Sequence, residues 1–496
     1  MKRIFSLRHF RLLFIGCLLL FGLYQVDKNA RVDDNALGEN LYFLLKEGVI
    51  RSEMMRGYGG LSLEVHQTIS HKLFLYLAYP FVALTGWSLA SLHLFSILCF
   101  ALLLLVLWKH FRFLIPYFPK TDRYFYGCLL LINYNVLYFS GTFRPEALLT
   151  LLGLLQFISL QQYLEKRSFA PLSLSAVLAG CALATHPHGA IFGAAGAVLL
   201  LMQKRWKVVP LYGITAALVF SGIYFADILW QGSFSLFQYQ TTHDPVIGLG
   251  QKAWYSPLLS LADEHVRLFF NEREIVTTLL FVFAFLFAGR SLWRRMPLTV
   301  IYFLGSFLAL GLLSYSNSPQ YLYLYLPYML AIVVAANSIV EASTHKAKKL
   351  FWRLLLAAYA GVHLFFALTH IFRNFSDLHK PGPAARNAAV ARLLPQPHTQ
   401  LRVLAYDDFV FNEIKHFQSI RSLTVYSFFR EAAHLPPMHL PELLAAARRS
   451  EVDFILLNAS YRERFGITDS LLRQYRSPAL PNLYYHSPDY TLFRIR

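Results

Sequence analysis

The sequence predicts a polytopic α-helical membrane protein with a small α/β domain at its C-terminus. Three observations predict this fold class: 56% of the 496 residues are hydrophobic, only 15% are charged, and the apolar residues gather in long runs. Soluble globular chains carry about 25% charged residues. The composition therefore rules out a disordered chain, disfavours a soluble multidomain enzyme and favours a chain with many membrane spans.

The apolar runs set the number of spans. A transmembrane helix needs roughly 20 mostly apolar residues, and fewer when it is buried in a bundle. We therefore expect about 11 to 13 transmembrane helices. The runs are 10–26, 72–108, 124–139, 145–163, 170–184, 189–203, 208–230, 274–289, 297–315, 321–341 and 350–372. The first run resembles a signal sequence without a clear cleavage site, so we interpret it as an uncleaved span.

The basic residues fix the predicted orientation. Lys and Arg total 46 against 28 Asp and Glu. This excess gathers in alternate loops and is assigned to membrane topology, not to nucleic acid. The basic clusters are Lys2/Arg3/Arg8/Arg11, Lys109/Arg112/Lys120/Arg123, Lys166/Arg167, Lys204/Arg205/Lys207, Arg290/Arg294/Arg295 and Lys346/Lys348/Lys349. One crossing per run places all of them in the cytoplasm, together with the N-terminus, and leaves the C-terminus outside.

One apolar run is too long for a single span. Residues 72–108 contain Pro80 and Gly86. Two crossings here would reverse every later loop and break the charge pattern. We therefore expect one crossing at about 88–108, preceded by a re-entrant or partly inserted helix at 72–86.

The remaining segments divide the chain into two expected domains. A membrane domain covers 1–372, with long outer segments at 27–71 and 231–273. A Pro-rich linker then opens a C-terminal extracytoplasmic α/β domain, 373–496. Its expected strands and helix are 401–406, 452–458, 490–495 and 440–449. The four cysteines lie in apolar runs and predict neither a disulfide framework nor a zinc site.

Two acidic motifs on the outer side are candidates for catalysis. Asp33 and Asp34 follow the first span, and Glu146 follows Arg144-Pro145. A carboxylate at this boundary could deprotonate an acceptor hydroxyl or amine. Alternatively, the aspartates are a solvated loop, and Glu146 is a helix-start carboxylate that the helix dipole favours.

Three further motifs carry polar side chains to the same boundary. They are His71-Lys72, Thr185-His186-Pro187-His188-Gly189 and Ser316-Asn317-Ser318-Pro319-Gln320-Tyr321. Lys72 could bind a phosphate or simply snorkel. The histidines could bind phosphate or sugar, or form a polar turn, and the tyrosines that follow Gln320 could form an aromatic belt. Because all five motifs fall on one predicted face, they favour a reaction on an anionic, lipid-anchored substrate.

In their order along the chain, these motifs resemble the GT-C superfamily of polytopic glycosyltransferases. The similar branch is that of the protein O-mannosyltransferases and lipid A aminoarabinose transferases. The resemblance rests on an outer acidic pair, Lys72 before an aromatic-rich stretch, Arg144-Pro145-Glu146 before a Leu-rich span, the Thr-His-Pro-His-Gly turn, and a Tyr-rich segment entering Leu326-Pro327. It covers most of 1–372.

The resemblance implies roles for individual residues. Asp33 matches the catalytic aspartate, and Asp34 stands where the family commonly has Glu. Lys72 matches a lysine that contacts the donor phosphate, although Leu73-Phe74 replaces the usual Pro-Pro. Arg144, Glu146, His186, His188, Gln320 and Tyr321 complete the expected donor and substrate site. His186 and Gln320 replace common basic residues, which indicates an altered donor or acceptor.

The resemblance implies an inverting transfer of a sugar from a polyprenyl-phosphate donor to a lipid, glycan or protein acceptor on the extracytoplasmic face. Asp33 and Glu146 are also candidates for holding a divalent cation, and no other cofactor is expected. The expected location is the bacterial inner membrane. Two alternatives remain: a glycan ligase or polymerase, for which Arg267 and Arg273 in the segment 231–273 are an argument, and a flippase of lipid-linked sugars.

Overall fold

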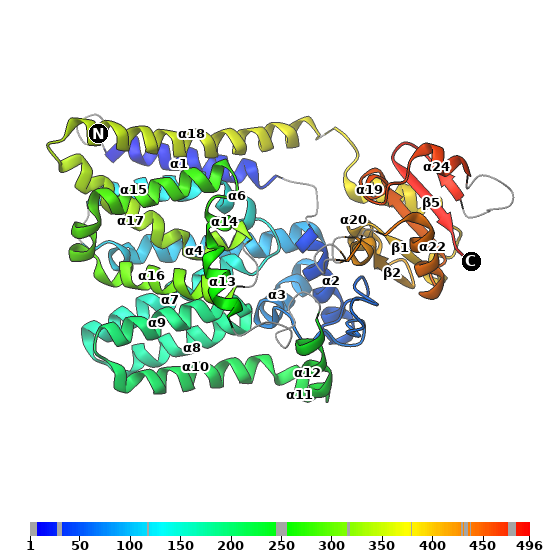
Figure 1. The fold of residues 1–496 in the computed structure, drawn as a ribbon, viewed down its shortest axis with the longest axis horizontal. Helices are drawn as coiled ribbons and strands as arrows, with labels where there is room; N and C mark the ends of the chain where they lie inside the picture. Colours follow the sequence, from blue (N-terminus) through cyan, green and yellow to red (C-terminus); the bar gives the residue numbers. More distant parts are fainter. Residues whose placement is uncertain are drawn as a thin grey trace.

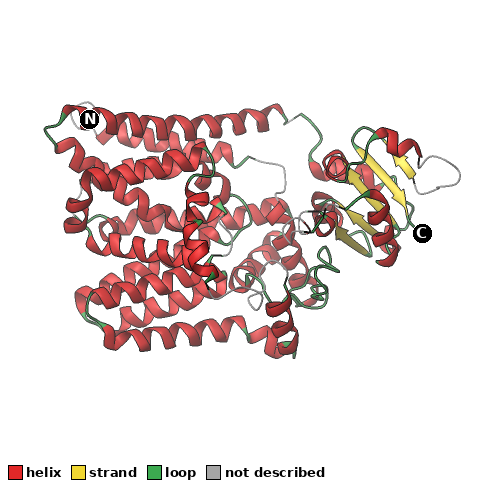
Figure 2. Cartoon of the chain, in the orientation of Figure 1, coloured by secondary structure: helices red, strands yellow, loops and turns green. Residues whose placement is uncertain are grey.

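A computed structural model gives the fold of the chain. It describes residues 7–26, 32–116, 119–244, 255–314, 318–377, 379–427, 430, 435–436, 438–474 and 483–496. The side chains of Val32, Asp33, Arg473 and Gln474 lie outside the described set. Figure 2 shows two parts in the region described: a large helical bundle and a small part that contains the strands.

The bundle consists of helices, most of them long and roughly parallel to one another (Figure 1). They are α1 (Leu7–Tyr24), α4 (Leu89–Leu114), α5 (Lys120–Ile132), α6 (Tyr134–Ser140), α7 (Glu146–Lys166), α8 (Phe169–Thr185), α9 (Ala190–Met202), α10 (Val209–Tyr224), α15 (Glu272–Arg295), α16 (Pro297–Leu313), α17 (Leu322–Ala342) and α18 (Lys346–Ser376). Among the described residues, seven helices are long and apolar enough to cross a membrane, and the four helical segments 72–85, 169–185, 187–202 and 297–313 are shorter and apolar. The expected fold class, a multi-pass helical membrane protein, is confirmed.

The predicted break inside the run 72–108 is also present. Helix α3 (Lys72–Thr85) ends at Gly86, which has a φ of +85°. A side chain at that angle would be strained, so glycine ends the helix. The Ser88 side chain then accepts a hydrogen bond from the Ser91 backbone N–H and caps the start of α4. The short helix and the long helix are therefore separate elements, as expected.

The connections divide cleanly between the two ends of the bundle. The basic clusters lie where α4, α7, α9 and α15 end and where α5 and α18 begin. The opposite end, called the outer end below, carries the C-terminal domain (Figure 1). Its short elements are α2 (Val32–Glu47), α3, α11 (Ala226–Trp230), α12 (Phe234–His243), α13 (Ser256–Ala262), α14 (Glu264–Leu268) and the 3₁₀ turns η1 (Pro187–Gly189) and η4 (Pro319–Tyr321).

The C-terminal part is built on one mixed sheet. Strands β1 (Arg402–Ala405), β2 (Ser419–Ser422), β3 (Phe454–Asn458), β4 (Leu483–His486) and β5 (Tyr490–Arg494) have the order β2-β1-β3-β5-β4. β1 is parallel to β2 and β3, whereas β5 is antiparallel to β3 and β4. The helices are α19 (Pro383–Ala391), α20 (Asp407–Glu413), α22 (Leu440–Arg449), α23 (Ala459–Arg464) and α24 (Asp469–Gln474).

The three expected strands and the expected helix at 440–449 are all found. β2 and β4 were not predicted. β2 reads Ser-Ile-Arg-Ser, so a single apolar residue marks it, and β4 lies at the edge with Tyr484 and Tyr485 exposed. Neither strand offers the alternation of apolar and polar residues that identifies a half-buried strand.

Candidate active site

Lys72 begins α3 and is fully buried at the outer end. Its ammonium donates a hydrogen bond to Oδ1 of Asp227 in α11 and lies 4.8 Å from the centre of the Tyr224 ring. A buried cation needs a counter-ion, because removing a charge from water is costly unless it is paired. Asp227 is that counter-ion here.

Asp227 also holds His66 from the long outer segment 27–71. His66 Nε2 lies 3.1 Å from Asp227 Oδ2, and His66 Nδ1 lies 2.9 Å from the Ser233 hydroxyl. The array Ser233–His66–Asp227–Lys72 therefore ties the segment before α3 to the turn after α11. A phosphate that takes Lys72 as its partner has to compete with Asp227.

Asp34 is fully buried near the start of α2. Its Oδ1 accepts a hydrogen bond of 2.6 Å from the Phe143 backbone N–H, and its Oδ2 lies 3.0 Å from His93 Nε2. Both oxygens therefore hold protein groups, and one of them fixes the turn that leads to Arg144. Asp33, the other predicted catalytic aspartate, has its side chain outside the described residues.

Arg144 and Glu146 form a buried ion pair directly after that turn. Arg144 Nε donates to both Glu146 oxygens at 3.0 Å, and Nη2 donates to Oε1 at 2.6 Å. Glu146 is the first residue of α7, where a carboxylate is favoured by the positive end of the helix dipole. The Phe139 ring centre lies 5.5 Å from the Arg144 guanidinium carbon.

Three histidine rings lie against one another between these elements, with His186 and His188 stacked and His71 tilted by 44° to His186. The ring centres of His71 and His186 are 4.7 Å apart, and those of His186 and His188 are 4.6 Å apart. The Tyr321 ring centre lies 4.0 Å from that of His188. The sequence motifs at 71, 186–188 and 321, which come from three separate segments of the chain, thus meet at one place.

Burial keeps these imidazoles uncharged. It lowers the pKa of His71 to about 4 and that of His188 to about 3, and it holds the pKa of His186 well below its usual range. Nearby cations contribute to this, Arg144 beside His71 and His186, and Arg267 beside His188. A neutral imidazole both donates and accepts a hydrogen bond, so the group can orient polar ligands without adding charge.

Arg267 of α14 completes the cluster and was not among the predicted site residues. Its Nη1 donates to Glu264 at 2.6 Å, its Nη2 to the Ser314 hydroxyl at 3.0 Å, and its Nε to the Ser318 carbonyl at 3.0 Å. Ser314 also lies 3.1 Å from His188 Nε2. The sequence signal was present, an arginine in a long outer segment, but its distance of over 50 residues from Tyr321 hid the contact.

Gln320 and Tyr321 share the turn η4, and Gln320 is half-buried there. The Tyr321 ring centre lies 5.7 Å from the Arg267 guanidinium carbon. Apart from Asp33 and Asp34, the predicted motifs therefore lie at the outer end in two adjoining groups. One contains Lys72 and Asp227, and the other contains Arg144, Glu146, the histidines, Tyr321 and Arg267.

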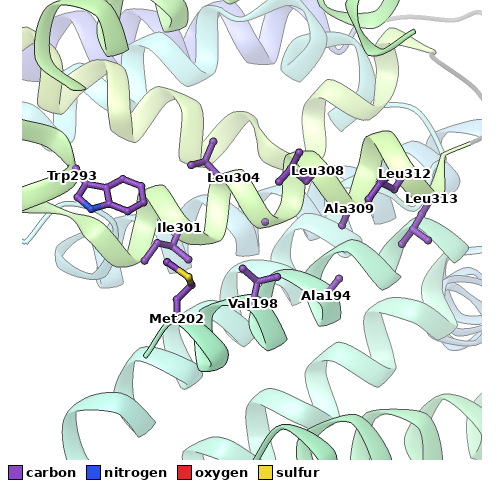
Figure 3. Close-up of a pocket in the computed structure, with 11 residues that line it drawn as sticks. Ala194, Val198, Met202, Trp293, Ile301, Leu304, Leu308, Ala309, Leu312 and Leu313 are labelled. Atoms are coloured by element: carbon purple, nitrogen blue, oxygen red, sulfur yellow. The ribbon is translucent and has the colours of Figure 1, made fainter. Parts of the chain in front are cut away.

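An apolar groove of about 480 Å³ runs between α9 and α16. Figure 3 shows Ala194, Val198 and Met202 of α9 facing residues of α16, with Trp293 of α15 at one end. Its lining is apolar apart from the indole nitrogen of Trp293, and the side chains of Met202 and Leu313 are exposed. Leu313 directly precedes Ser314, the hydroxyl that Arg267 and His188 share, so one end of the groove adjoins the polar cluster.

The described side chains around Glu146 do not form the predicted metal site. Within the described residues there is no group of three or more His, Cys, Asp or Glu side chains placed to hold a metal ion. Both oxygens of Glu146 accept hydrogen bonds from Arg144, a cation that a metal would have to displace. Glu146 as arranged here does not fit the role of a metal ligand.

Comparisons with known proteins found one sequence family and several solved structures that are similar to this chain. Residues 72–230 match the sequence family described as dolichyl-phosphate-mannose-protein mannosyltransferase. No curated protein matches the chain. Two structures of ArnT from Cupriavidus metallidurans are similar in fold, one in the apo state and one bound to undecaprenyl phosphate. Both have a TM-score of 0.59 and 13% identity over 98% of this chain and 97% and 98% of theirs.

A second relative in fold is the oligosaccharyltransferase AglB of Archaeoglobus fulgidus in complex with an inhibitory peptide and a dolichol-phosphate. It has a TM-score of 0.52 and 11% identity over 90% of this chain and 70% of that one. These comparisons confirm the resemblance that the motifs indicated.

Proposed function

We propose that this chain is a multi-pass membrane glycosyltransferase of the GT-C type, which moves a sugar from a polyprenyl-phosphate donor to an acceptor at the outer end of the bundle. The observation that carries the proposal is the junction at Leu313-Ser314. There an apolar groove with Met202 and Leu313 exposed along it adjoins a cluster that contains Arg267, His188 and Tyr321.

The groove supports a lipid-borne donor. It follows α16 from Ile301 to Leu312, twelve residues that span about 16 Å of helix. An isoprenoid chain could lie along it with only the indole nitrogen of Trp293 as a polar group to desolvate. One similar structure holds undecaprenyl phosphate and another a dolichol-phosphate, which supports the same class of donor here.

The polar cluster supports binding of the phosphate. When the sugar leaves, the polyprenyl phosphate gains negative charge, and stabilising that charge is the main electrostatic task of the site. Arg267 can offer its guanidinium, and His186 and His188 can donate neutral N–H groups. Lys72 can add a second charge if the donor phosphate displaces Asp227.

The outer carboxylates supply the base and the positioning group for the reaction at the sugar. Asp33 takes the proton of an acceptor hydroxyl or amine, and the acceptor oxygen or nitrogen forms the new bond to the anomeric carbon. The bond from that carbon to the phosphate oxygen breaks on the opposite face, so the configuration inverts. Asp34, whose oxygens hold Phe143 and His93, positions the turn that carries Arg144.

The test compares Asp33→Asn with wild type in a deletion strain, using mass spectrometry of envelope lipids, glycans and glycoproteins. A sugar present with wild type and lost with Asp33→Asn at matched protein level supports the proposal. If Asp33→Asn transfers the sugar at the wild-type level, Asp33 does not take the proton of the acceptor. If the deletion strain has the same lipids, glycans and glycoproteins as wild type, the proposed transferase activity is contradicted.

The arrangement of the arginines bears on the ligase alternative. Arg267 lies in the polar cluster, whereas Arg273 Nε donates to Asn271 and the Arg273 guanidinium carbon lies 4.2 Å from the Tyr134 ring centre. The two arginines thus have separate partners, and a paired-arginine site is not formed. We therefore propose transfer of a sugar, with the outer end on the extracytoplasmic side of a bacterial inner membrane.

A further inference from the structure

The C-terminal domain and the bundle exchange side chains. Phe411 of α20 belongs to the C-terminal domain, yet it is 5% exposed and packs within the core of the bundle. Its ring centre lies 5.2 Å from that of Trp87. On α2 it meets Gly38, where an added Cβ would lie only 3.0 Å from the Phe411 ring. A side chain at residue 38 would therefore push against the Phe411 ring, and also against Leu92 at 3.1 Å.

Met54 makes the reverse contact. It comes from the long outer segment before α3, yet it is 2% exposed and packs within the core of the C-terminal domain. Its carbonyl accepts a hydrogen bond of 2.9 Å from the Ser422 backbone N–H, and the neighbouring Glu53 accepts one of 2.5 Å from the Ser419 hydroxyl. The domain is therefore attached at two places, to α2 itself through Phe411 and to the segment after α2 through Met54.

Helix α2 connects this attachment to the candidate active site. Asn35 donates to Asp408 of α20 at 3.3 Å. Asp34 lies one helical turn before Gly38 and accepts a hydrogen bond from the Phe143 N–H, the residue before Arg144. A shift of α2 therefore moves Asp34 and, through it, the turn that presents the Arg144–Glu146 pair.

We propose that Phe411 is a positioning residue for glycosyl transfer: by packing on Gly38 it sets α2, and through Asp34 it sets the Phe143–Arg144 turn. This inference rests on the proposed function. Phe411 acts only through the helix. The C-terminal domain is thereby part of the transferase site, not a separate module joined to it.

The first test measures kcat and donor KM of the full chain with Phe411→Ala, with transfer followed from the lipid-phosphate sugar identified in the deletion strain. Misplacing a reacting group by an ångström lowers a rate by about a hundredfold, so we expect kcat to fall about 10- to 100-fold. The donor KM should stay within about threefold of wild type, because the groove between α9 and α16 is not touched.

The matched control is Phe417→Ala. Phe417 is 7% exposed and lies in the core of the C-terminal domain, with its ring centre 4.7 Å from that of His398. Like Phe411→Ala, the Phe417→Ala variant removes a phenyl ring from the C-terminal domain, but Phe417 does not contact α2. This variant should lower the melting temperature but leave kcat unchanged at a temperature where both variants are folded.

A double-mutant cycle supplies the second test. Gly38→Val should lower kcat by pushing Phe411 away, and Phe411→Ala should make room for the valine. Relative to wild type, the kcat of the double variant should be at least about fivefold higher than the product of the relative kcat values of the two single variants. Such a coupling is expected of residues in contact. Additive effects would show that the two positions do not act together.

Hydrogen exchange of residues 141–146 gives a readout that does not depend on activity. It should increase in Phe411→Ala and stay at the wild-type level in Phe417→Ala. Equal kcat in Phe411→Ala and wild type, equal losses in both alanine variants, or unchanged exchange would each overturn the inference. If wild type transfers no lipid-phosphate sugar, the proposed function fails, and the exchange experiment still decides whether Phe411 sets the turn.

Discussion

Single side chains at the outer end are buried with their charges paired, and the pair of Lys72 and Asp227 shows what this means for stability. Lys72 is fully buried, and the Asp227 side chain is 19% exposed. Breaking such a pair by removing one partner leaves an uncompensated charge, which costs more than the pair itself contributes.

We expect Asp227→Asn to destabilise the protein by roughly 3 kcal/mol, because Lys72 loses its counter-ion. The double variant Lys72→Met with Asp227→Asn should recover most of the lost stability, since it removes both charges and keeps the volume. Melting temperatures in detergent measure both effects. If Asp227→Asn is as stable as wild type, Lys72 does not depend on this partner.

The double variant also separates stability from donor binding. If Lys72 contacts the donor phosphate as proposed, the folded double variant should bind undecaprenyl phosphate more weakly than wild type. Equal affinity would leave Arg267 and the histidines as the phosphate-binding groups.

Glu39 predicts a dependence of stability on pH. Burial raises its pKa to about 8, against the effect of hydrogen bonds from Ser52 and the Met54 N–H. The folded protein therefore binds a proton that the unfolded chain releases near its ordinary pKa of about 4.3. The contribution to stability is present at low pH and is lost as the pH rises from about 4.5 to 8.

We expect the melting temperature and the protection of the Met54 amide to fall over that pH range in wild type. Glu39→Gln, which cannot ionise, should lose this part of the dependence. Parallel pH profiles for the two proteins would contradict the assignment.

At the scale of elements, the groove between α9 and α16 is a property of two helices packed side by side. Ala309 contributes a small side chain to the lining. We expect Ala309→Phe to fill the groove and raise the KM for a long-chain polyprenyl-phosphate donor about tenfold. A short-chain donor analogue should be affected less, because it leaves most of the groove empty.

Leu218→Phe is the matched control for the groove. Leu218 is 67% exposed on α10, outside the groove lining. It should leave the donor KM unchanged. An equal rise in KM for both variants, or for both lengths of donor, would mean that the lipid chain binds elsewhere.

The elements also show how far sequence reasoning reached. The apolar runs and the basic clusters predicted the long helices and their two ends, because hydrophobic length and charge are local properties. The break at Gly86 was predictable for the same reason. Arg267 and Asp227 were not predicted as site residues, since their partners, Ser314 and Lys72, lie far away in sequence and nothing local marks the contacts.

The roles of predicted site residues were only partly accessible for a similar reason. The motifs placed His186, His188 and Tyr321 on one face, and the structure brings their rings together, whereas their roles stay predictions. That Glu146 has both oxygens on Arg144 depends on side-chain geometry, which spacing does not give. The interleaving of Met54 and Phe411 was also beyond sequence reasoning, because each looks like an ordinary apolar residue of its own segment.

For the whole molecule, the arrangement of charge predicts which end faces which compartment. Val65 is exposed at the outer end, and Lys346 is exposed at the basic end. In a chain without its four native cysteines, Val65→Cys should react with an impermeant thiol reagent added to intact cells, and Lys346→Cys should react only after permeabilisation. Labelling of both from the same side would contradict the orientation.

The exchange of Met54 and Phe411 has a consequence for biogenesis. Residue 54 emerges from the ribosome long before residue 411, so the bundle inserts with a vacancy where the phenylalanine belongs and with the methionine uncovered. Neither core is complete until residues 54 and 411 have both been synthesised. A chain truncated before residue 411 should therefore have an incomplete bundle core as well as an incomplete C-terminal domain.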